Sequence, residues 1–229
     1  MSAKNNATLL ALLQVSDSAL PIGAYSHSYG LETWVQEGVL QNANDVSAAV
    51  LVLLRHSVAP QQGMACAIAR QCAVNNDLSR FADLNQILSA SNWVKETKQA
   101  SLQMGSRLAR LAREIGWFDN EDVDFSQCKH DLHHAAVYGW LSALLQIEEL
   151  DSIAAYLYGC CASMTSACLR LVPLGHTESQ KLLAGLHSEI NILAQTCLGK
   201  SEAEMHSFAP MNERACVEHE SLYSRLFQS

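Results

Sequence analysis

Apolar residues recur at every third or fourth position along most of the chain, a spacing typical of helices that bury one face. The pattern is clearest over Asn92–Glu114, and Gly116 follows it as a C-terminal cap should. The apolar stripe of this segment consists of Trp93, Thr97, Ala100, Met104, Leu108, Leu111 and Ile115. Asn-Gly and Asp-Gly hairpin signals are absent, and alternating β-branched runs are scarce. The sequence therefore predicts an all-α fold.

Interruptions of this pattern divide the chain into about nine helices. The interruptions are Pro21, Gly38, Pro60, residues 75–77, the acidic stretch 119–124, Pro173 and Gly199. The predicted helices are Thr8–Val15, Ser28–Glu37, Asn44–Val58, Gln61–Val74, Leu78–Ala90, Asn92–Glu114, Leu132–Ile147, Leu150–Leu171 and Glu178–Leu198. We find no internal repeat and no long linker, so residues 1–229 are expected to form a single domain, an irregular helical bundle.

Residues 199–229 differ from the rest of the chain, because they are polar and weakly patterned as far as Leu222. From there Leu222, Tyr223, Leu226 and Phe227 form i/i+4 pairs, which predict a short terminal helix. Such a helix is shorter than the ~12–15 residues that an isolated helix needs, so it must dock on something. The spacing leaves two alternatives open: the tail docks on its own bundle, or it anchors in a partner protein.

The composition suits a globular protein whose partners are not nucleic acids. The chain has 229 residues, 49% of them hydrophobic, and a formal net charge of −8. Phosphate contacts need clustered Lys and Arg, so this charge argues against nucleic-acid binding. The eight cysteines show no CxxC spacing, which argues against a zinc ribbon or a thioredoxin-like centre. Their scattered positions favour free thiols, as expected of a cytoplasmic protein.

Two apolar segments could be mistaken for targeting or membrane sequences. The first, 8–15, contains Gln14 and is followed at once by Asp17, which argues against a signal peptide. The second, 152–169, is uncharged and close to the ~18 residues that suggest a membrane span. It is rich in Ser, Thr, Cys and Gly and ends at Arg170. We therefore expect a buried central helix and no membrane association.

Two motifs resemble catalytic ones but lack the geometry that catalysis needs. The residues of Ser26–Ser28, with a histidine between two serines, are sequence neighbours, so their side chains point apart and cannot form a nucleophile–base contact. Leu198–Ser201 reads LGKS, as at the end of a phosphate-binding loop, but the position five residues before Gly199 is Ala194. A predicted helix also takes the place of the required strand. The sequence thus predicts no catalytic residue and no cofactor.

A histidine cluster offers an alternative centre of function. His130, His133 and His134 fall at one predicted helix start, and His130 and His134 are one helical turn apart. Two imidazoles without a carboxylate or thiolate in register bind a metal weakly. Exposed, ordinary histidines explain the pattern more simply, and a metal carrier is the alternative.

The stretch SDSALPIGAYSHSYGLE, Ser16–Glu32, is predicted to shape a contact surface and not an active site. Gly30 lets another backbone segment approach closely, and Ser26 or Ser28 is expected to cap the next helix. Glu32 would lie near the start of that helix, where the helix dipole favours a carboxylate. The expected surface is a rigid polar-aromatic ledge of Tyr25, His27 and Tyr29.

The same stretch closely resembles the N-terminal signature of the UreF family of urease accessory proteins. The likeness continues in the same order through essentially the whole chain, and a signature of this length is specific. The further matching segments are KETKQASLQMG (Lys95–Gly105), HHAAVYGWLSALL (His133–Leu145), AYLYGCCASMTSACLRLVPLGHTESQKLL (Ala155–Leu183) and HESLYSRLFQS (His219–Ser229). Cys72–Ala90 and Asp119–Lys129 match no motif of the family.

The resemblance implies an all-α, non-enzymatic assembly factor of the cytoplasm. Proteins of this family form homodimers, bind the accessory protein UreD (also called UreH) and through it recruit the GTPase UreG. The assembly docks on apo-urease and supports GTP-dependent nickel insertion. Under the alternative, the chain itself carries nickel on His130, His133 and His134.

The resemblance also implies which residues bind partners. Residues of the signature, with two polar residues of later helices, would face UreG or the dimer interface, and residues of the tail would grip UreD. The complete set is Tyr25, His27, Tyr29, Gly30, Glu32, Gln99, Arg170, Tyr223, Arg225, Leu226 and Phe227.

Overall fold

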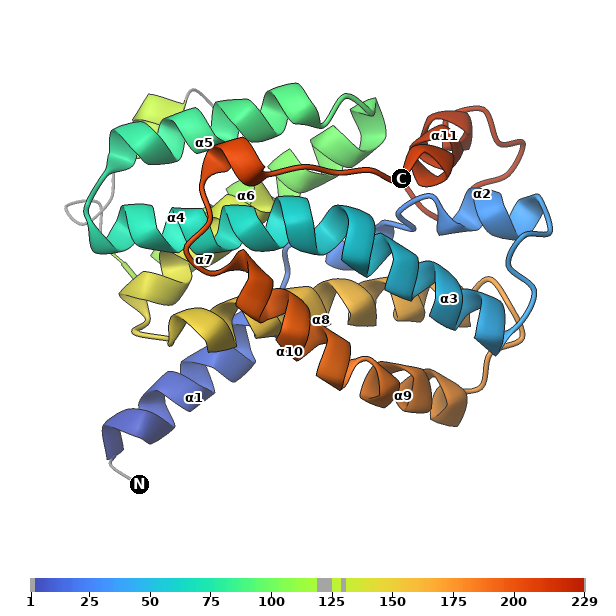
Figure 1. Cartoon of the computed structure of the whole chain (residues 1–229), viewed down its shortest axis with the longest axis horizontal. Coiled ribbons are helices and arrows are strands. Elements are labelled where there is room, and N and C mark those ends of the chain that lie inside the picture. Colours follow the sequence, from blue (N-terminus) through green and yellow to red (C-terminus); the bar gives the residue numbers. More distant parts are fainter. Residues whose placement is uncertain (1–2, 119–124, 129–130, 229) are drawn as a thin grey trace.

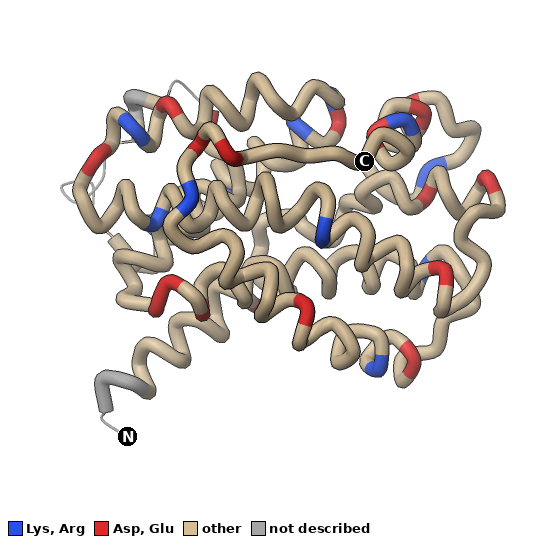
Figure 2. Tube along the Cα trace, in the orientation of Figure 1, with Lys and Arg blue, Asp and Glu red and all other residues tan. Residues whose placement is uncertain are grey.

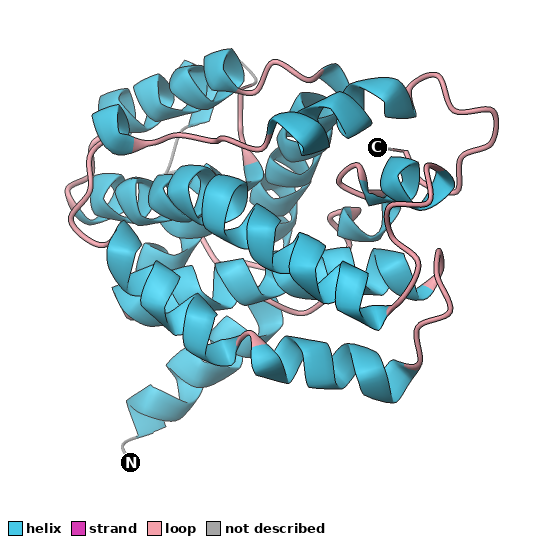
Figure 3. Cartoon of the chain, turned by 45° about the vertical axis from the view of Figure 1, so that its right-hand side comes forward, coloured by secondary structure: helices cyan, strands magenta, loops and turns pink. Residues whose placement is uncertain are grey.

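The computed structural model describes residues 3–118, 125–128 and 131–228. Within these ranges the chain consists of helices and loops and contains no strand (Figure 3). The prediction of an all-α fold is confirmed. The α-helices are α1 (Ala3–Val15), α2 (Leu31–Gln36), α3 (Ala43–Leu53), α4 (Met64–Val74), α5 (Leu78–Ser91), α6 (Lys95–Glu114), α7 (His134–Leu144), α8 (Glu149–Leu169), α9 (His176–Gly185), α10 (His187–Cys197) and α11 (Pro210–His219).

Helices α2 to α11 form the body of the molecule, and α1 extends away from it (Figure 1). Within this body α4 packs extensively on α7, α6 also packs on α7, and α10 lies against α8. At one end of the molecule α2 and α11 lie side by side, next to the C-terminus of the chain (Figure 1). Segments from the two ends of the sequence therefore meet at this end of the fold.

The predicted break at Pro60 is wrong, because the chain passes through this proline in one long helix. α3 continues through a π-helical segment, Leu54–Gly63, directly into α4 (Figure 1). The amide of Met64 bonds the carbonyl of Ala59, five residues back. Proline has no N–H and clashes with the carbonyl four residues before it in an α-helix. The wider π-helical turn accommodates the ring without ending the helix.

The carbonyl that Pro60 leaves without an α-helical donor is satisfied from the C-terminal part of the chain. The amide of Phe208 donates to the carbonyl of His56 at 2.8 Å, and the amide of His206 donates to the carbonyl of Pro60 at 3.2 Å. Backbone polar groups inside a protein need such partners. Residues 206–208 therefore run along the π-helical segment as a strap that leads into α11.

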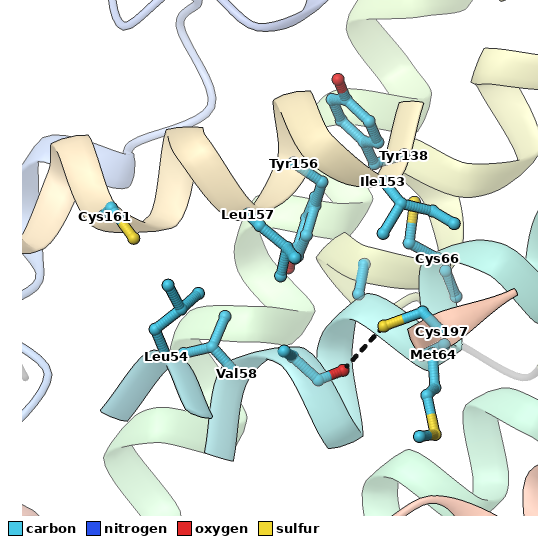
Figure 4. Packing of buried hydrophobic residues seen from close by; sticks show 14 of the residues in the cluster. Leu54, Val58, Met64, Cys66, Tyr138, Ile153, Tyr156, Leu157, Cys161 and Cys197 are labelled. Atoms are coloured by element: carbon cyan, nitrogen blue, oxygen red, sulfur yellow. Dashed lines mark hydrogen bonds between the residues drawn. The ribbon is translucent and has the colours of Figure 1, made fainter. Parts of the chain in front are cut away.

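The core lies between this long helix and α7, α8 and α10, and its buried residues form one contiguous cluster. Figure 4 shows Leu157 of α8 beside the π-helical segment, which contributes Leu54 and Val58. The thiol of Cys197 in α10 donates to the carbonyl of Ala59 at 3.4 Å (Figure 4). That the whole of 1–229 forms a single domain stays a prediction.

The apolar segment 152–169 lies within α8, a helix of the core. Among the described residues, α8 is long and apolar enough to cross a membrane, and 50% of its apolar window is buried. Charged residues lie near its two ends, and its middle carries none (Figure 2). The buried face includes Ile153, Leu157, Cys161, Met164 and Cys168. Burial against other helices thus accounts for its apolar composition.

The tail also differs from its prediction. Residues 220–228 contain turns and bends and no helix, so the predicted terminal helix is wrong. The helix of this region is α11, which lies in the stretch with the weakest apolar pattern. Pro210 begins α11, at a position where the missing N–H of proline costs no hydrogen bond.

Four smaller predictions had different outcomes. The late helix is divided at Leu186 into α9 and α10. Neither Ser26 nor Ser28 caps α2, which begins after Gly30 without a side-chain cap. The cap at Gly116 is confirmed by its positive φ of 75°. The stripe of α6 is buried in its middle, whereas Trp93, just before the helix, is 64% exposed.

Two glycines allow α7 and the residues before it to approach their neighbours closely. A Cβ at Gly139 of α7 would collide with the backbone of Cys66 in α4, and one at Gly105 of α6 would collide with the backbone of Leu132. Gly159 of α8 differs, because apart from the adjoining backbone of its own helix no heavy atom lies within 4 Å of the position its Cβ would take.

We expect Gly139→Ala to lower the free energy of unfolding by about 2–3 kcal/mol, because α4 and α7 must separate to admit the methyl group. Gly159→Ala is the matched control. It should raise the stability by about 0.5–1 kcal/mol, since alanine is the better residue in a helix interior. Urea denaturation followed by circular dichroism measures both changes. Equal effects of the two substitutions would contradict the close packing of α7 on α4.

Candidate partner-docking site

The tail, residues 220–228, folds back onto the body beside α2 and α6. The amide of Gln228 donates to the carbonyl of Ser26 at 2.8 Å. The side-chain amide of Gln36 donates to the carbonyl of Ser224 at 2.9 Å. Of the two alternatives for the tail, docking on its own bundle is therefore the arrangement in this structure. A partner can meet only the outer side of the docked tail.

Glu32 binds the backbone of the tail. It lies in the first turn of α2, as predicted, and is 2% exposed. Its Oε1 accepts the amide of Leu226 at 2.7 Å, and its Oε2 accepts the amide of Phe227 at 3.2 Å. A buried carboxylate is tolerated when hydrogen bonds replace its hydration. The tail thus supplies part of what keeps this charge inside the fold.

A histidine and a second carboxylate extend this cluster. Nε2 of His219 lies 2.9 Å from Oε2 of Glu32, and its Nδ1 lies 2.7 Å from Oε2 of Glu96 in α6. Arg225 of the tail donates from a guanidinium nitrogen to Oε1 of Glu96 at 2.8 Å. The four side chains join α2, α6, α11 and the tail through contiguous polar contacts.

Arg170, at the end of α8, covers the last aromatic ring of the chain. Its guanidinium carbon lies 4.1 Å from the ring centroid of Phe227 and 5.3 Å from that of Tyr25. The same guanidinium donates to the carbonyl of Tyr25 at 2.8 Å. Phe227 is 4% exposed while Arg170 itself is exposed, so the guanidinium covers the ring from the solvent side. A planar guanidinium can stack and donate at once, which a lysine cannot do.

The turn before α2 is shaped to receive α11. Tyr29 and Gly30 have positive φ angles of 56° and 80°. A Cβ at Gly30 would lie 2.8 Å from Sγ of Cys216, which any larger side chain would have to displace. The side-chain amide of Asn212 donates to the carbonyl of Tyr29 at 2.7 Å. The backbone oxygen of Asn212 would lie 3.3 Å from that Cβ, so the expected close approach of another backbone segment at Gly30 is confirmed, and the segment is α11.

A small polar pocket of about 230 Å³ separates part of the tail from α6. Its lining includes His27, Gln99, Gln103 and Gln228. Burial, and to a smaller extent the nearby charge of Arg107, lowers the pKa of His27, so its imidazole is neutral at neutral pH. Gln99 is exposed at this pocket, whereas His27 is buried.

The predicted partner-binding residues come from distant parts of the sequence and gather around the tail, but their exposure differs. Of the three residues of the predicted ledge, Tyr25 is 58% exposed, whereas Tyr29 is partly buried and His27 is buried. Tyr223 is fully exposed, and Leu226 is 58% exposed. The buried members are His27, Gly30, Glu32 and Phe227. The site therefore has a buried layer that binds the tail and an outer layer open to solvent.

The histidines proposed as metal ligands do not form a site in the described residues. His130 lies outside those residues. His133 is buried, and its two ring nitrogens lie 2.9 Å from the hydroxyls of Ser89 and Ser101. The ring of His134 packs against Tyr156. Within the described ranges no group of three His, Cys, Asp or Glu side chains could hold a metal ion.

A larger cavity of about 540 Å³ lies between α8, the π-helical segment and residues 15–29. His134, Tyr138 and Tyr156 are among its lining residues. Burial raises the pKa of both tyrosines and lowers that of His134 to about 4, so these three groups are uncharged at neutral pH. A histidine with so low a pKa is a weak base, and neither tyrosine is ionised, so these three groups supply no strong base and no anionic ligand.

Sequence reasoning missed three residues of the tail site: Glu96, Asn212 and His219. Glu96 lies beside the apolar stripe of α6 and resembles an ordinary solvated residue in the helical pattern. His219 and Asn212 belong to a stretch without clear periodicity. His219 was the first residue of the matching segment HESLYSRLFQS, and that was the one signal that could have drawn attention to it.

We expect Phe227→Ala to release the tail, because the change removes a buried ring and its contact with Arg170, together worth about 2–4 kcal/mol. Amide hydrogen exchange at Leu226 and Gln228 should then become at least about tenfold faster, with unchanged helical circular dichroism. Tyr223→Ala is the matched control, since its fully exposed side chain should not affect exchange. Equally fast exchange in both variants would argue against the docked arrangement.

We expect the free energy of unfolding to fall as the pH drops from about 6.5 to about 4, because His133 is buried in its neutral form. Burial lowers its pKa to about 4, whereas the unfolded chain takes up the proton near pH ~6.5. The stability that the neutral His133 contributes is fully present above pH ~6.5. About 3 kcal/mol of it is lost by the time the pH has fallen to about 4. Denaturant titrations at several pH values should show a weaker acid dependence for His133→Gln.

His187→Gln, at an exposed position of α10, is the control and should leave the acid dependence unchanged. Equilibrium dialysis with Ni²⁺ should give the same binding for His133→Gln and the unaltered chain. Loss of stoichiometric nickel binding in His133→Gln would instead favour the carrier hypothesis.

Comparison with known proteins identifies the family. A family model described as UreF matches residues 40–187. The chain is 32% identical over 221 residues to the urease accessory protein UreF of Geobacillus kaustophilus (strain HTA426). The alignment covers 96% of this chain and 98% of that protein. The chain is 29% identical over 225 residues to the urease accessory protein UreF of Bacillus sp. (strain TB-90), covering 96% and 99%. The resemblance found in the sequence is confirmed, and the chain belongs to the UreF family of urease accessory proteins.

Proposed function

We propose that the chain is a non-enzymatic scaffold of urease maturation. It binds UreD (UreH) through the outer side of its tail, recruits the GTPase UreG and holds both on apo-urease in the cytoplasm. As a homodimer it supports GTP-dependent insertion of nickel. Membership of a urease accessory family supports the accessory role, and the named partners extend it.

The observation that carries this proposal is the division of the tail into a bound inner side and an exposed outer side. Phe227 is buried beneath Arg170, while Tyr223 and Leu226 point outward on the same ordered backbone. Tyrosine is enriched among residues that dominate protein interfaces. Because the backbone is already ordered, a partner loses less conformational entropy when it binds these side chains.

The remaining predicted residues divide between contact and support. Tyr25 and Gln99 are exposed beside the tail and are assigned to the contact with UreG. His27, Gly30 and Glu32 are buried, so they would act by holding the tail and α11 in position. Loss of a supporting residue would then weaken partner binding indirectly.

The state of the cysteine thiols supports a role without nucleophilic chemistry. Burial raises the pKa of Cys66 and of Cys160 to about 12. The thiolate is the reactive form of cysteine, and both groups remain protonated at neutral pH. These two thiols are therefore suited to packing in the core.

We expect Tyr223→Ala and Leu226→Ala each to weaken binding to purified UreD by about tenfold or more, equivalent to about 1.4 kcal/mol. The reason is that each removes an exposed apolar side chain from the proposed contact without removing a contact of the buried layer. Titration calorimetry with the full chain measures the affinity, and hydrogen exchange at Phe227 confirms that the tail stays docked.

Val74→Ala provides the control, because Val74 is 65% exposed but lies at the end of α4, outside the tail and the segments that bind it. Its affinity for UreD should equal that of the unaltered chain. Unchanged affinity in both tail variants would remove the tail from the proposed contact with UreD.

A further inference from the structure

We propose that His219 is protonated when the tail is docked, and that this proton makes tail docking dependent on pH. The inference concerns contacts within the chain alone. It holds or fails independently of which protein, if any, binds the tail.

The geometry of His219 requires two donors. Each ring nitrogen lies within hydrogen-bond distance of a carboxylate, at 2.9 Å from Glu32 and 2.7 Å from Glu96. A neutral imidazole has one N–H and one lone pair, and an ionised carboxylate can only accept. Both contacts are hydrogen bonds to ionised carboxylates only when the ring is an imidazolium. An imidazolium and the guanidinium of Arg225 together then balance the two carboxylates.

The other charged and titratable groups near this cluster do not replace that proton. Lys95 pairs with Glu220 at 3.8 Å on the exposed side. Burial raises the pKa of Cys216, on the same helix, to about 12, so the thiol is neutral. Burial also lowers the pKa of His27, across the polar pocket from Glu96, so that imidazole is neutral as well. Among these described groups, His219 is the one whose two ring nitrogens both face carboxylates.

Loss of this proton acts on the tail through Glu32. A neutral His219 directs a lone pair at one of two carboxylates, the buried Glu32 or the partly buried Glu96, and the repulsion is relieved when water reaches them. Glu32 binds the backbone amides of Leu226 and Phe227, so water can reach its carboxylate once these two residues move away. Over the pH range in which the docked His219 is protonated and the released His219 is not, the docked state therefore holds one more proton than the released state. By linkage, docking is strong at the acidic side and weakens as the pH rises, by at most about tenfold per pH unit.

Hydrogen exchange of the full chain tests this coupling. The amides of Leu226 and Phe227 are followed from about pH 6 to about pH 8.5, with rates divided by the intrinsic exchange rate at each pH. We expect their protection to fall with rising pH by up to about tenfold per pH unit. In His219→Gln, which has no titrating ring, protection should not depend on pH.

His206→Gln is the matched control, because His206 is exposed and precedes α11 in the same C-terminal region. It should behave as the unaltered chain. Protection that does not change with pH in the unaltered chain, or that falls equally in His219→Gln, would overturn the proposal.

Two further measurements keep the proposal testable if His219→Gln disturbs α11. Glu96→Gln supplies an amide that can donate to a neutral ring, so the fall in protection should move to lower pH by about one unit or more. Nitrogen chemical shifts of the His219 ring near pH ~7 should show both nitrogens protonated. One unprotonated nitrogen in the docked state would refute the inference.

Discussion

The end of the molecule at which α2 and α11 meet depends on how the buried carboxylate of Glu32 is satisfied. A charge removed from water is destabilising unless hydrogen bonds and opposite charges replace its hydration. Its own helix is short and begins without a side-chain cap, so the neighbouring sequence provides little. The donors come from 187 to 195 residues further along the chain, on α11 and the tail. Closing this end of the fold therefore requires the C-terminal segment.

The π-helical segment poses a similar requirement at a second place. Pro60 leaves the carbonyl of His56 without its α-helical donor, and the amide of Phe208 replaces that donor. One continuous stretch, from the strap at 206–208 through α11 to the tail, thus satisfies a backbone acceptor in the middle of the chain and a carboxylate near its start. These polar contacts fix the position of a segment whose own apolar pattern is too weak to specify it.

How far the sequence predicted the structure follows from the range of the interactions involved. Helices α5, α6 and α8 have a repeating apolar stripe, and their boundaries agree with prediction to within a few residues. The predicted break at Pro60 fails because the rule for proline holds for α-helices and not for the wider π-turn. The i/i+4 pairs around Tyr223 and Phe227 predict a helix, whereas backbone donors of this region bind the distant Glu32. Glu96 and His219 escaped notice because contacts across the whole chain give no local signal. The family resemblance depends on motifs and not on periodicity, and it named residues that the structure brings together around the tail; that they bind partners stays a prediction.

The two sides of the docked tail carry different physical roles. The inner side accounts for its position: Phe227 lies beneath a guanidinium, and the amides of Leu226 and Phe227 end on a buried carboxylate. The side chain of Tyr223 takes no part in this, because it is fully exposed. An aromatic ring in water contributes little to folding, yet the ordered backbone presents it in one orientation. Stability therefore gives no reason for a tyrosine at this position, and any function of its ring must lie in contacts outside the chain. If the proton on His219 governs how long the tail stays docked, it also governs how long that ring is presented.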